Sequence, residues 1–201
     1  MSSKCNVVII EDGVHSGSFA KIQLVKDDTK TYIRRIKHIR ELGIKDVHKM
    51  LKHPNIIKFY ESSMITLDNA MYNVDNIEYA SNGDLYEYIV ENKNPMGCDR
   101  KILVLLDIIK GLQYMHEVCC LVHMDIKLEN ILLMGNMTAK ISDFDFTVLS
   151  GTTITFVNIG PRQIRQPELK VKQTAYTAAF SMDMWCMGII VYELFDQSGR
   201  M

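Results

Sequence analysis

The sequence lacks most of the features that mark a secreted, membrane-spanning or nucleic-acid-binding protein. Its formal net charge is only -1 over 201 residues, so no strong field of one sign points to nucleic acid or to an acidic membrane surface as a partner. The longest apolar run, WCMGIIVYELF from Trp185, is interrupted by Glu193 and is too short to span a bilayer. The start, MSSKCNVVII, has neither a basic leader nor a small-residue cleavage site, which predicts no secretory signal.

Cysteine pairs at metal-binding or redox spacing are also missing. The five cysteines include no CxxC pair and no companion histidine at zinc-finger spacing. An odd, scattered set fits a reducing compartment, and we expect the adjacent Cys119 and Cys120 to be small buried thiols. The composition therefore predicts a cytoplasmic protein of one domain, or of two small lobes sharing a cleft, without nucleic acid or membrane as a partner.

Local periodicity divides the chain into a strand-rich part and a helical part. The predicted strands cover residues 7–10, 20–25, 31–36, 55–65 and 70–79. A helix is predicted between the third and fourth strands, from about residue 40 to residue 51. From Asp84 onward the pattern becomes helical, and it predicts helices over 85–92, 100–116 and 181–195. The long loop 146–165 indicates a functional segment, because loops of that length are uncommon in compact domains.

Two segments in the middle of the chain carry the side chains that phosphoryl transfer needs. The sequence HMDIKLENILL contains Asp125, Lys127 and Asn130, and the sequence ISDFD, which follows it closely, contains Asp143. A carboxylate can orient a hydroxyl group, a lysine can neutralise phosphate, and an amide with a second carboxylate can hold Mg²⁺.

Both segments resemble the catalytic loop and the metal-binding loop of eukaryotic-type serine/threonine protein kinases. The resemblance implies that Asp125 orients the substrate hydroxyl group and that Lys127 contacts the transferring phosphate. It also implies that Asn130 and Asp143 ligate Mg²⁺. A lysine two residues after the aspartate resembles the serine/threonine kinases in particular.

Two residues depart from the family's pattern in these segments. Met124 stands where relatives carry an arginine that pairs with a phosphate on the activation loop, which implies a kinase that this phosphorylation does not control. Asp145 stands where relatives carry glycine, and it restricts the backbone and adds negative charge near Asp143, unless it faces solvent.

The nucleotide-binding part of the resemblance is weaker. GSFAKI resembles the end of the glycine-rich loop, whose bare backbone approaches ATP phosphates, and it makes Gly17 and Ile22 candidate ATP contacts. Only one of the three glycines is present, because His15 and Ala20 replace the other two. The loop is therefore degraded relative to the family's pattern.

The ATP-anchoring lysine has two candidates. Lys37 lies at a family-like interval after the glycine-rich segment, and Arg34 is the alternative. With Lys37, Arg35 occupies the same strand face, where relatives carry a small alanine above adenine. In relatives a helix glutamate pairs with this lysine, but the matching position here is Ile44. Glu41, one turn earlier, is either a substitute partner or an exposed helix charge.

IEYASNGDLYEYI resembles the hinge of the family and the helix after it. The resemblance makes Ile77 the gatekeeper and offers the backbone of Glu78 and Ala80 to adenine. It also places Asp84 at the ribose and Leu132 beneath the base.

DMWCMGIIVYEL resembles the αF helix, whose aspartate, here Asp183, supports the catalytic loop from behind. Relatives continue beyond αF with helices that cover it. A chain truncated at this point should expose an apolar face, which predicts a partner or self-association.

Taken over essentially the whole chain, the resemblance implies the α+β bilobal fold of protein kinases. We expect a five-stranded N-lobe sheet with one helix over 1–79 and a mainly helical, incomplete C-lobe over 80–201. The implied function is Mg²⁺-dependent transfer of the ATP γ-phosphate to a protein serine or threonine. The alternative is a weak or inactive pseudokinase or decoy that regulates another kinase by binding it. A third hypothesis is a poorly folding gene fragment.

Overall fold

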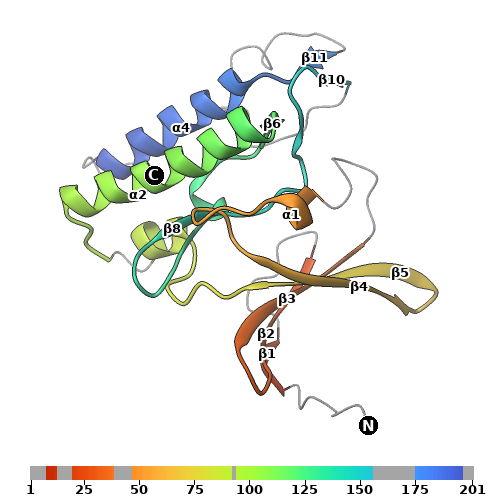
Figure 1. Cartoon of the computed structure of the whole chain (residues 1–201). Coiled ribbons are helices and arrows are strands. Elements are labelled where there is room, and N and C mark those ends of the chain that lie inside the picture. The colour runs from red at the N-terminus through yellow and green to blue at the C-terminus, as the bar shows by residue number, and fades with distance from the viewer. Residues whose placement is uncertain (1–7, 13–19, 39–46, 92–93, 156–174, 197–201) are drawn as a thin grey trace. The chain divides into compact units, whose positions relative to one another are not determined.

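The computed structural model describes residues 8–12, 20–38, 47–91, 94–155 and 175–196, and Figure 1 shows their helices and strands. The chain divides into two compact units. The first unit takes residues from 1–41, 48–52 and 57–79, and the second takes residues from 42–47, 53–56 and 80–201.

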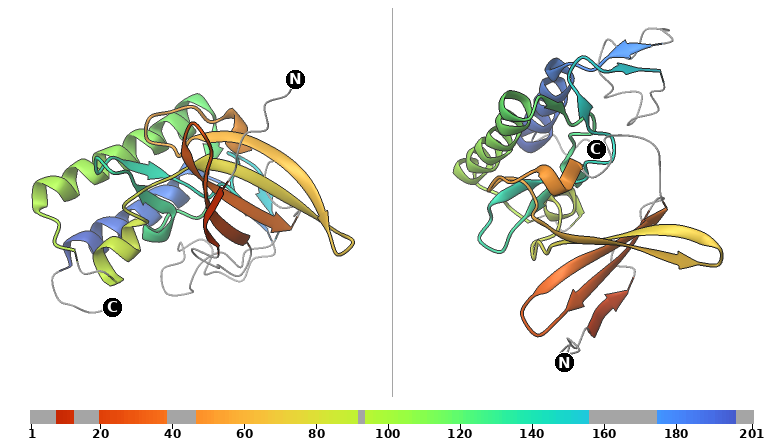
Figure 2. Two further views of the ribbon diagram at one scale, coloured as in Figure 1. Left: turned by 90° about the horizontal axis from the view of Figure 1, so that it is seen from below. Right: turned by 45° about the vertical axis from the view of Figure 1, so that its right-hand side comes forward.

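A five-stranded antiparallel sheet makes up most of the first unit. In the order in which they pair, its strands are β1 (Val8–Asp12), β2 (Ala20–Lys26), β3 (Thr31–His38), β5 (Ala70–Glu78) and β4 (Phe59–Leu67). The β2–β3 turn is closed by Asp27, whose carboxylate accepts hydrogen bonds from Thr29 and Lys30. In the long β4–β5 hairpin of Figure 2, Asp68 and Asn69 take the left-handed backbone conformation that a tight hairpin turn requires.

All five predicted strands are present, with shifted ends. The largest shift concerns the strand predicted over 55–65, which begins only at Phe59. Its first residues are engaged in the second unit instead, where Ile141 donates its N–H to the carbonyl oxygen of Asn55 and the Asn55 amide donates to the Ala139 carbonyl oxygen. Of the helix predicted over 40–51, the structure describes α1 (Val47–Met50), and residues 39–46 lie outside the described residues.

Two long helices lie side by side in the second unit (Figures 1 and 2). They are α2 (Cys98–Gln113), which continues as a π-helical turn over Tyr114–Val118, and α4 (Phe180–Phe195). Gly111 of α2 permits a close approach, because a Cβ there would lie 2.8 Å from Ile141 Cδ1 and 2.9 Å from the Asn55 carbonyl oxygen. The predicted helix 85–92 appears as a π-helical turn over Glu87–Glu91.

The sequence predicts an apolar stripe on α2 and its π-helical continuation formed by Ile102, Leu105, Leu106, Ile109, Leu112 and Met115. Leu112 and Met115 are buried as predicted, whereas Ile102, Leu106 and Ile109 are exposed. Val104, Ile108 and Gly111 are buried as well. The stripe is rotated because α2 packs against strand β8 (Ala139–Ile141) through the side that contains Gly111.

Short strand pairs shape the rest of the second unit. The pairs are β6 (Leu121–Val122) with β9 (Val148–Leu149), β7 (Ile131–Leu133) with β8, and β10 (Thr153–Ile154) with β11 (Tyr176–Thr177). The described part of the predicted loop 146–165 thus contains β9 and β10. Cys120, which we expected to be buried, is exposed.

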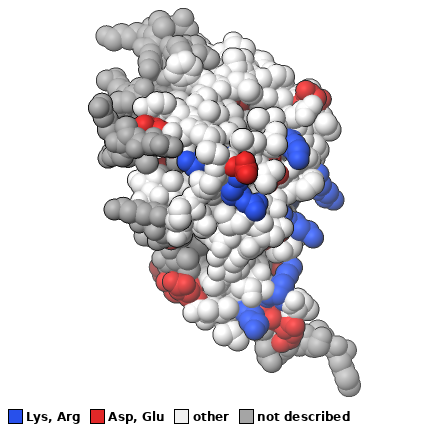
Figure 3. Space-filling model, turned by 90° about the vertical axis from the view of Figure 1, so that its left-hand side faces the viewer, with Lys and Arg blue, Asp and Glu red and all other residues white. Residues whose placement is uncertain are grey.

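The surface carries both signs of charge. On the face shown in Figure 3, the Lys and Arg side chains are mostly separated from one another by uncharged residues, and Asp and Glu side chains lie among them. Within the described ranges, no helix is long and apolar enough to cross a membrane.

Candidate active site

Asp125, Lys127 and Asn130 come together in the loop between β6 and β7. Lys127 Nζ lies 2.9 Å from Asp125 Oδ2. The Asn130 side-chain amide donates to the same oxygen at 2.8 Å and to the Asp125 backbone carbonyl oxygen at 2.7 Å. Both Asp125 and Asn130 are buried. The three residues therefore form one hydrogen-bonded group, in which Asp125 receives a cation and an amide.

The two oxygens of the Asp125 carboxylate are used differently. Lys127 and Asn130 both contact Oδ2, and no described residue donates a hydrogen bond to Oδ1. Because the contacts to Oδ2 fix the orientation of the carboxylate, Oδ1 can accept a hydrogen bond from a hydroxyl group of another molecule. This geometry suits a carboxylate that orients a nucleophilic hydroxyl.

Burial and charge act in opposite directions on Lys127. Burial by itself would lower the pKa of Lys127, but the charge of Asp125, its hydrogen bond, and the charges of Glu129 and Asp143 outweigh burial and raise this pKa above its ordinary value. The ammonium group therefore stays protonated around neutral pH and can compensate the charge of a phosphate.

Asn130 and Asp143 have the donor atoms that Mg²⁺ prefers. Because the Asn130 amide nitrogen faces the Asp125 oxygens, its carbonyl oxygen Oδ1 points elsewhere and remains available as a hard ligand. Asp143 adds a carboxylate on a left-handed backbone, with φ 61°. Among the described residues no group of three or more His, Cys, Asp or Glu side chains could hold a metal ion. Mg²⁺ bound to nucleotide phosphates needs only one or two carboxylates from the protein.

Asp183 of α4 supports the backbone that carries these residues. Its fully buried carboxylate accepts the N–H groups of His123 at 2.8 Å and Met124 at 2.9 Å, and it contacts His116 Nε2 at 2.8 Å. His123 in turn accepts the Asp125 N–H at Nδ1. Asp183 thus lies where the sequence resemblance placed it, behind the loop and one step removed from Asp125.

Met124 packs into an apolar cluster. It is 1% exposed and lies with Val122, Ala178 and Met182, and partly buried residues of the following segment pack against this group: Phe146, Val148, Ile154, Tyr176 and Phe180. The side chain that stands at the position of the family's arginine therefore belongs to an apolar cluster against which residues of β9, β10 and β11 pack, and it brings no charge to this cluster.

Asp145 does not sit on a backbone that requires glycine. Positive φ angles occur at Met124 and Asp143 in this region, and Asp145 is not one of the residues that adopt them. The aspartate is therefore accommodated without left-handed strain.

In the first unit, Lys37 and Arg34 lie on opposite faces of β3, because side chains alternate along a strand. Arg34 contacts neutral groups, donating to Asn76 Oδ1 and to the Tyr32 hydroxyl. Lys37 Nζ instead lies 3.5 Å from a carboxylate oxygen, Oδ2 of Asp75 on β5. This difference favours Lys37 over Arg34 as the candidate for phosphate binding.

Asp75 is a candidate site residue that was not predicted from the sequence. Ile44, which stands at the position of the family's helix glutamate, and Glu41, the substitute partner considered for the lysine, lie outside the described residues. A signal was present, because Asp75 lies two residues before Ile77 and therefore shares its strand face.

The remaining predicted nucleotide contacts fall in both units. Ile22 of β2 pairs with Arg35, and Gly17 lies outside the described residues. Glu78 donates its N–H to the Lys58 carbonyl oxygen and accepts the Lys58 N–H at Oε2. The structure brings Asp84 and Leu132 together in an isolated bridge, and one oxygen of Asp84 accepts the N–H of Glu87.

Ala80 is buried, and it is the first residue of the range 80–201 that belongs to the second unit. After it, Gly83 takes φ 70°, which closes the turn before Asp84. A Cβ at this glycine would also lie 2.7 Å from Glu87 Oε2.

Comparison with known proteins matches most of the chain to one protein family. The family model described as "Protein kinase domain" matches residues 10–199. The chain is 28% identical to "Aurora kinase" of Encephalitozoon cuniculi over 193 residues, which cover 88% of this chain and 66% of that protein. It is 32% identical to "SNF1-like protein kinase ssp2" of Schizosaccharomyces pombe, covering 92% of this chain and 33% of that protein.

A third similar protein is "Serine/threonine-protein kinase KIN4" of Saccharomyces cerevisiae, at 33% identity, with 86% of this chain and 21% of that protein covered. The chain thus spans less than two thirds of the length of each of these relatives.

Proposed function

The chain belongs to the protein kinase family and has its α+β fold, and on this premise we propose that it transfers the γ-phosphate of ATP to a serine or threonine hydroxyl group of a protein. The observation that supports this most is the Asp125, Lys127 and Asn130 group, which leaves Asp125 Oδ1 to accept a hydrogen bond. One relative, KIN4 of Saccharomyces cerevisiae, is named as a serine/threonine-protein kinase, which favours that substrate class.

Each residue has a defined part in this proposal. Asp125 orients the substrate hydroxyl and accepts its proton, and Lys127 compensates charge on the transferring phosphate. Asn130 and Asp143 hold Mg²⁺, which when bound neutralises charge on the phosphate oxygens. Lys37 binds ATP phosphates, and the backbone of Glu78 and Ala80 binds adenine.

Replacing the carboxylate of Asp125 tests catalysis directly. Asp125→Asn removes the proton acceptor but keeps the size of the side chain, so phosphotransfer to a protein substrate should fall at least about 100-fold, the usual size of a general-base contribution. Wild-type protein and the variant are purified in parallel and assayed for phosphoserine and phosphothreonine. Equal signals from the two preparations would show that a contaminating kinase produces the activity.

The second candidate function is that of a pseudokinase or decoy, favoured by the replacement of glycine by Asp145 and by the degraded glycine-rich segment. The two functions differ in turnover. Binding of Mg-ATP raises the thermal midpoint by mass action. A wild-type protein that shows no midpoint shift at millimolar Mg-ATP and no phosphotransfer would favour the decoy.

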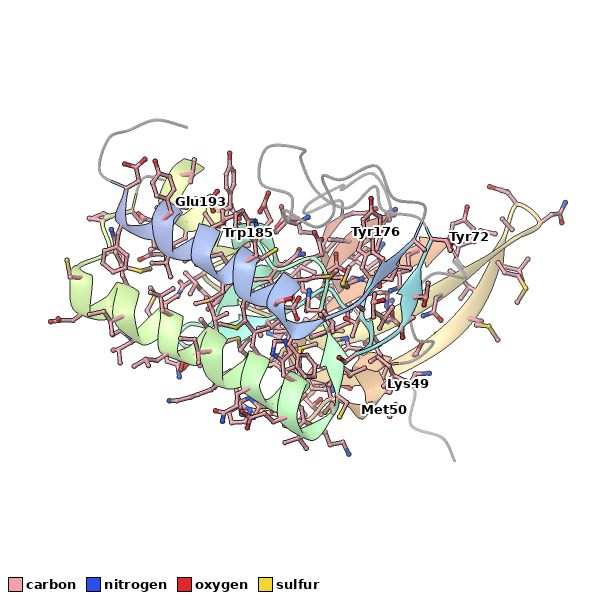
Figure 4. The ribbon with its side chains drawn as sticks, turned by 90° about the horizontal axis from the view of Figure 1, so that it is seen from above. Lys49, Met50, Tyr72, Tyr176, Trp185 and Glu193 are labelled. Carbon is pink, nitrogen blue, oxygen red and sulfur yellow. The ribbon has the colours of Figure 1, made fainter. Side chains whose placement is uncertain are left out.

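Partners follow from both functions: a protein substrate in the first case and a partner kinase in the second. Self-association through α4 is a further part of the proposal, supported by its exposed side chains Met184, Trp185, Val191, Tyr192 and Phe195. Figure 4 shows Trp185 and Glu193 on this helix. Light scattering should then give a mass that rises with concentration, and a constant monomer mass would contradict this part. A cytoplasmic location remains the prediction from the sequence.

A further inference from the structure

The contact between Lys37 and Asp75 carries an inference that rests on the proposed function and deepens it. The Lys37 ammonium lies 3.5 Å from Asp75 Oδ2, and the two side chains are only 21% and 12% exposed. Burial at this level reduces the screening that makes surface ion pairs weak. The pair is therefore well placed to fix the position of the lysine.

Strand register explains why these residues meet. Lys37 of β3 is paired with Asn73 of β5, and Arg35 is paired with Asp75. Directly paired residues share a face of the sheet, and residues two apart on a strand do so as well. Lys37 and Asp75 are thus diagonal neighbours on one face, at a distance that a long lysine side chain can bridge.

The carboxylate of Asp75 is itself held in place. Its second oxygen, Oδ1, accepts the Ser62 hydroxyl at 2.7 Å and the Asn73 side-chain amide at 2.8 Å. These donors come from β4 and from β5, so one oxygen is fixed by the sheet while the other faces Lys37. An orientation shared by three paired strands is rigid compared with one set by a single flexible contact.

The ammonium group can serve Asp75 and a phosphate at the same time. Its nitrogen carries three N–H donors, and the contact to Asp75 Oδ2 needs only one of them. A contact to one carboxylate oxygen is therefore compatible with binding of a phosphate oxygen by the same ammonium group.

We propose that Asp75 is the positioning residue for Lys37, and that it holds the lysine for ATP binding from within the sheet. Both partners lie on paired strands. This contact therefore acts on the orientation of the lysine from within the sheet, between β3 and β5.

A double-mutant cycle tests this inference. Wild-type protein, Asp75→Asn, Lys37→Met and the double variant are titrated by calorimetry with the magnesium complex of a non-hydrolysable ATP analogue. Asp75→Asn retains an acceptor for Ser62 and loses the charge, and it should weaken binding about tenfold. In the Lys37→Met background, the same change should alter the affinity less than about twofold, because the lysine through which it acts is gone.

Glu61→Gln is the matched control. Glu61 lies on β4 and accepts the Asn76 side-chain amide, while Asn76 belongs to the face of β5 opposite Asp75. This control removes one carboxylate charge from the same sheet and should leave nucleotide affinity unchanged. Thermal unfolding of the four proteins of the cycle, without nucleotide, measures the coupling between Lys37 and Asp75 independently of ATP binding. The double variant should unfold at a temperature no lower than that of the less stable single variant.

The outcomes separate the two proposals. If Asp75→Asn leaves the affinity unchanged, or weakens it equally in the Lys37→Met background, the inference is wrong while the proposed function stands. Equal weakening would mean that Asp75 acts through Arg35 or through the fold. If the cycle without nucleotide shows coupling but wild-type protein binds no analogue, ATP binding fails as a function. The role of the pair toward nucleotide then fails with it.

Discussion

The two units hold their candidate functional residues in different ways. In the second unit, Asp183 fixes the backbone of the loop that carries Asp125, and the candidate catalytic residues lie within a few residues of one another in the chain. In the first unit, Lys37 is fixed through side chains on neighbouring strands, with its partner Asp75 far away in the sequence. Residues that are close together in the chain can be predicted as one group from the sequence. Residues that meet only because distant strands pair, such as Lys37 and Asp75, cannot be predicted in this way.

The largest effect is expected from removing the Asp183 carboxylate, which accepts backbone N–H groups of the loop in the second unit. Asp183→Ala removes the acceptor of two buried N–H groups and the partner of His116, so unfolding should become easier by about 4 kcal/mol. Urea unfolding followed by circular dichroism measures the change. Asp107→Ala is the control, since Asp107 accepts a single backbone N–H, that of Ala139, and should cost about 1 kcal/mol. Equal losses would contradict the special role of Asp183.

The apolar cluster around Met124 should show the next largest effect. Met124→Ala leaves a cavity in the apolar cluster of Val122, Met124, Ala178 and Met182, which should cost about 3 kcal/mol of stability. Met124→Leu keeps the volume and should cost less than about 1.5 kcal/mol. Denaturant unfolding of both variants checks this order, and a tolerated alanine would show that the cluster is loosely packed.

The pH dependence of stability tests a buried group of the first unit, the His48 side chain. His48 is largely buried, its Nε2 lies 2.7 Å from the Ile57 carbonyl oxygen, and burial lowers its pKa from 6.5 to about 4. Between these two values the unfolded chain binds the proton more readily, so stability falls as the pH falls. About 2 kcal/mol should be lost between pH 7 and pH 5. His48→Gln should flatten this part of the profile; an unchanged slope would assign the loss to other groups.

The smallest expected effect is a gain in stability. The Thr147 hydroxyl is completely buried, and no described residue forms a hydrogen bond with it. Thr147→Val replaces this hydroxyl by a methyl group of similar size and should stabilise the protein by about 1 kcal/mol. Thr29→Val is the control, because Thr29 donates to Asp27 and its loss should destabilise. Thermal unfolding distinguishes a gain from a loss.

Much of the fold could be predicted because its signals are local. The alternation of residues predicted the strands of the sheet, although not their ends. Periodicity predicted only part of the buried face of α2, because apolar residues occur around much of this helix. The close approach at Gly111 decides which of them are buried.

The sequence by itself determined the family and the candidate catalytic loop, because Asp125, Lys127 and Asn130 are near neighbours in the chain and a short loop brings them together. Only the tertiary structure decided that Met124 joins an apolar cluster and that Asp75 meets Lys37. The physical reason is that these contacts depend on strand register and packing between distant segments. The sequence alone does not show which residues of distant segments come into contact.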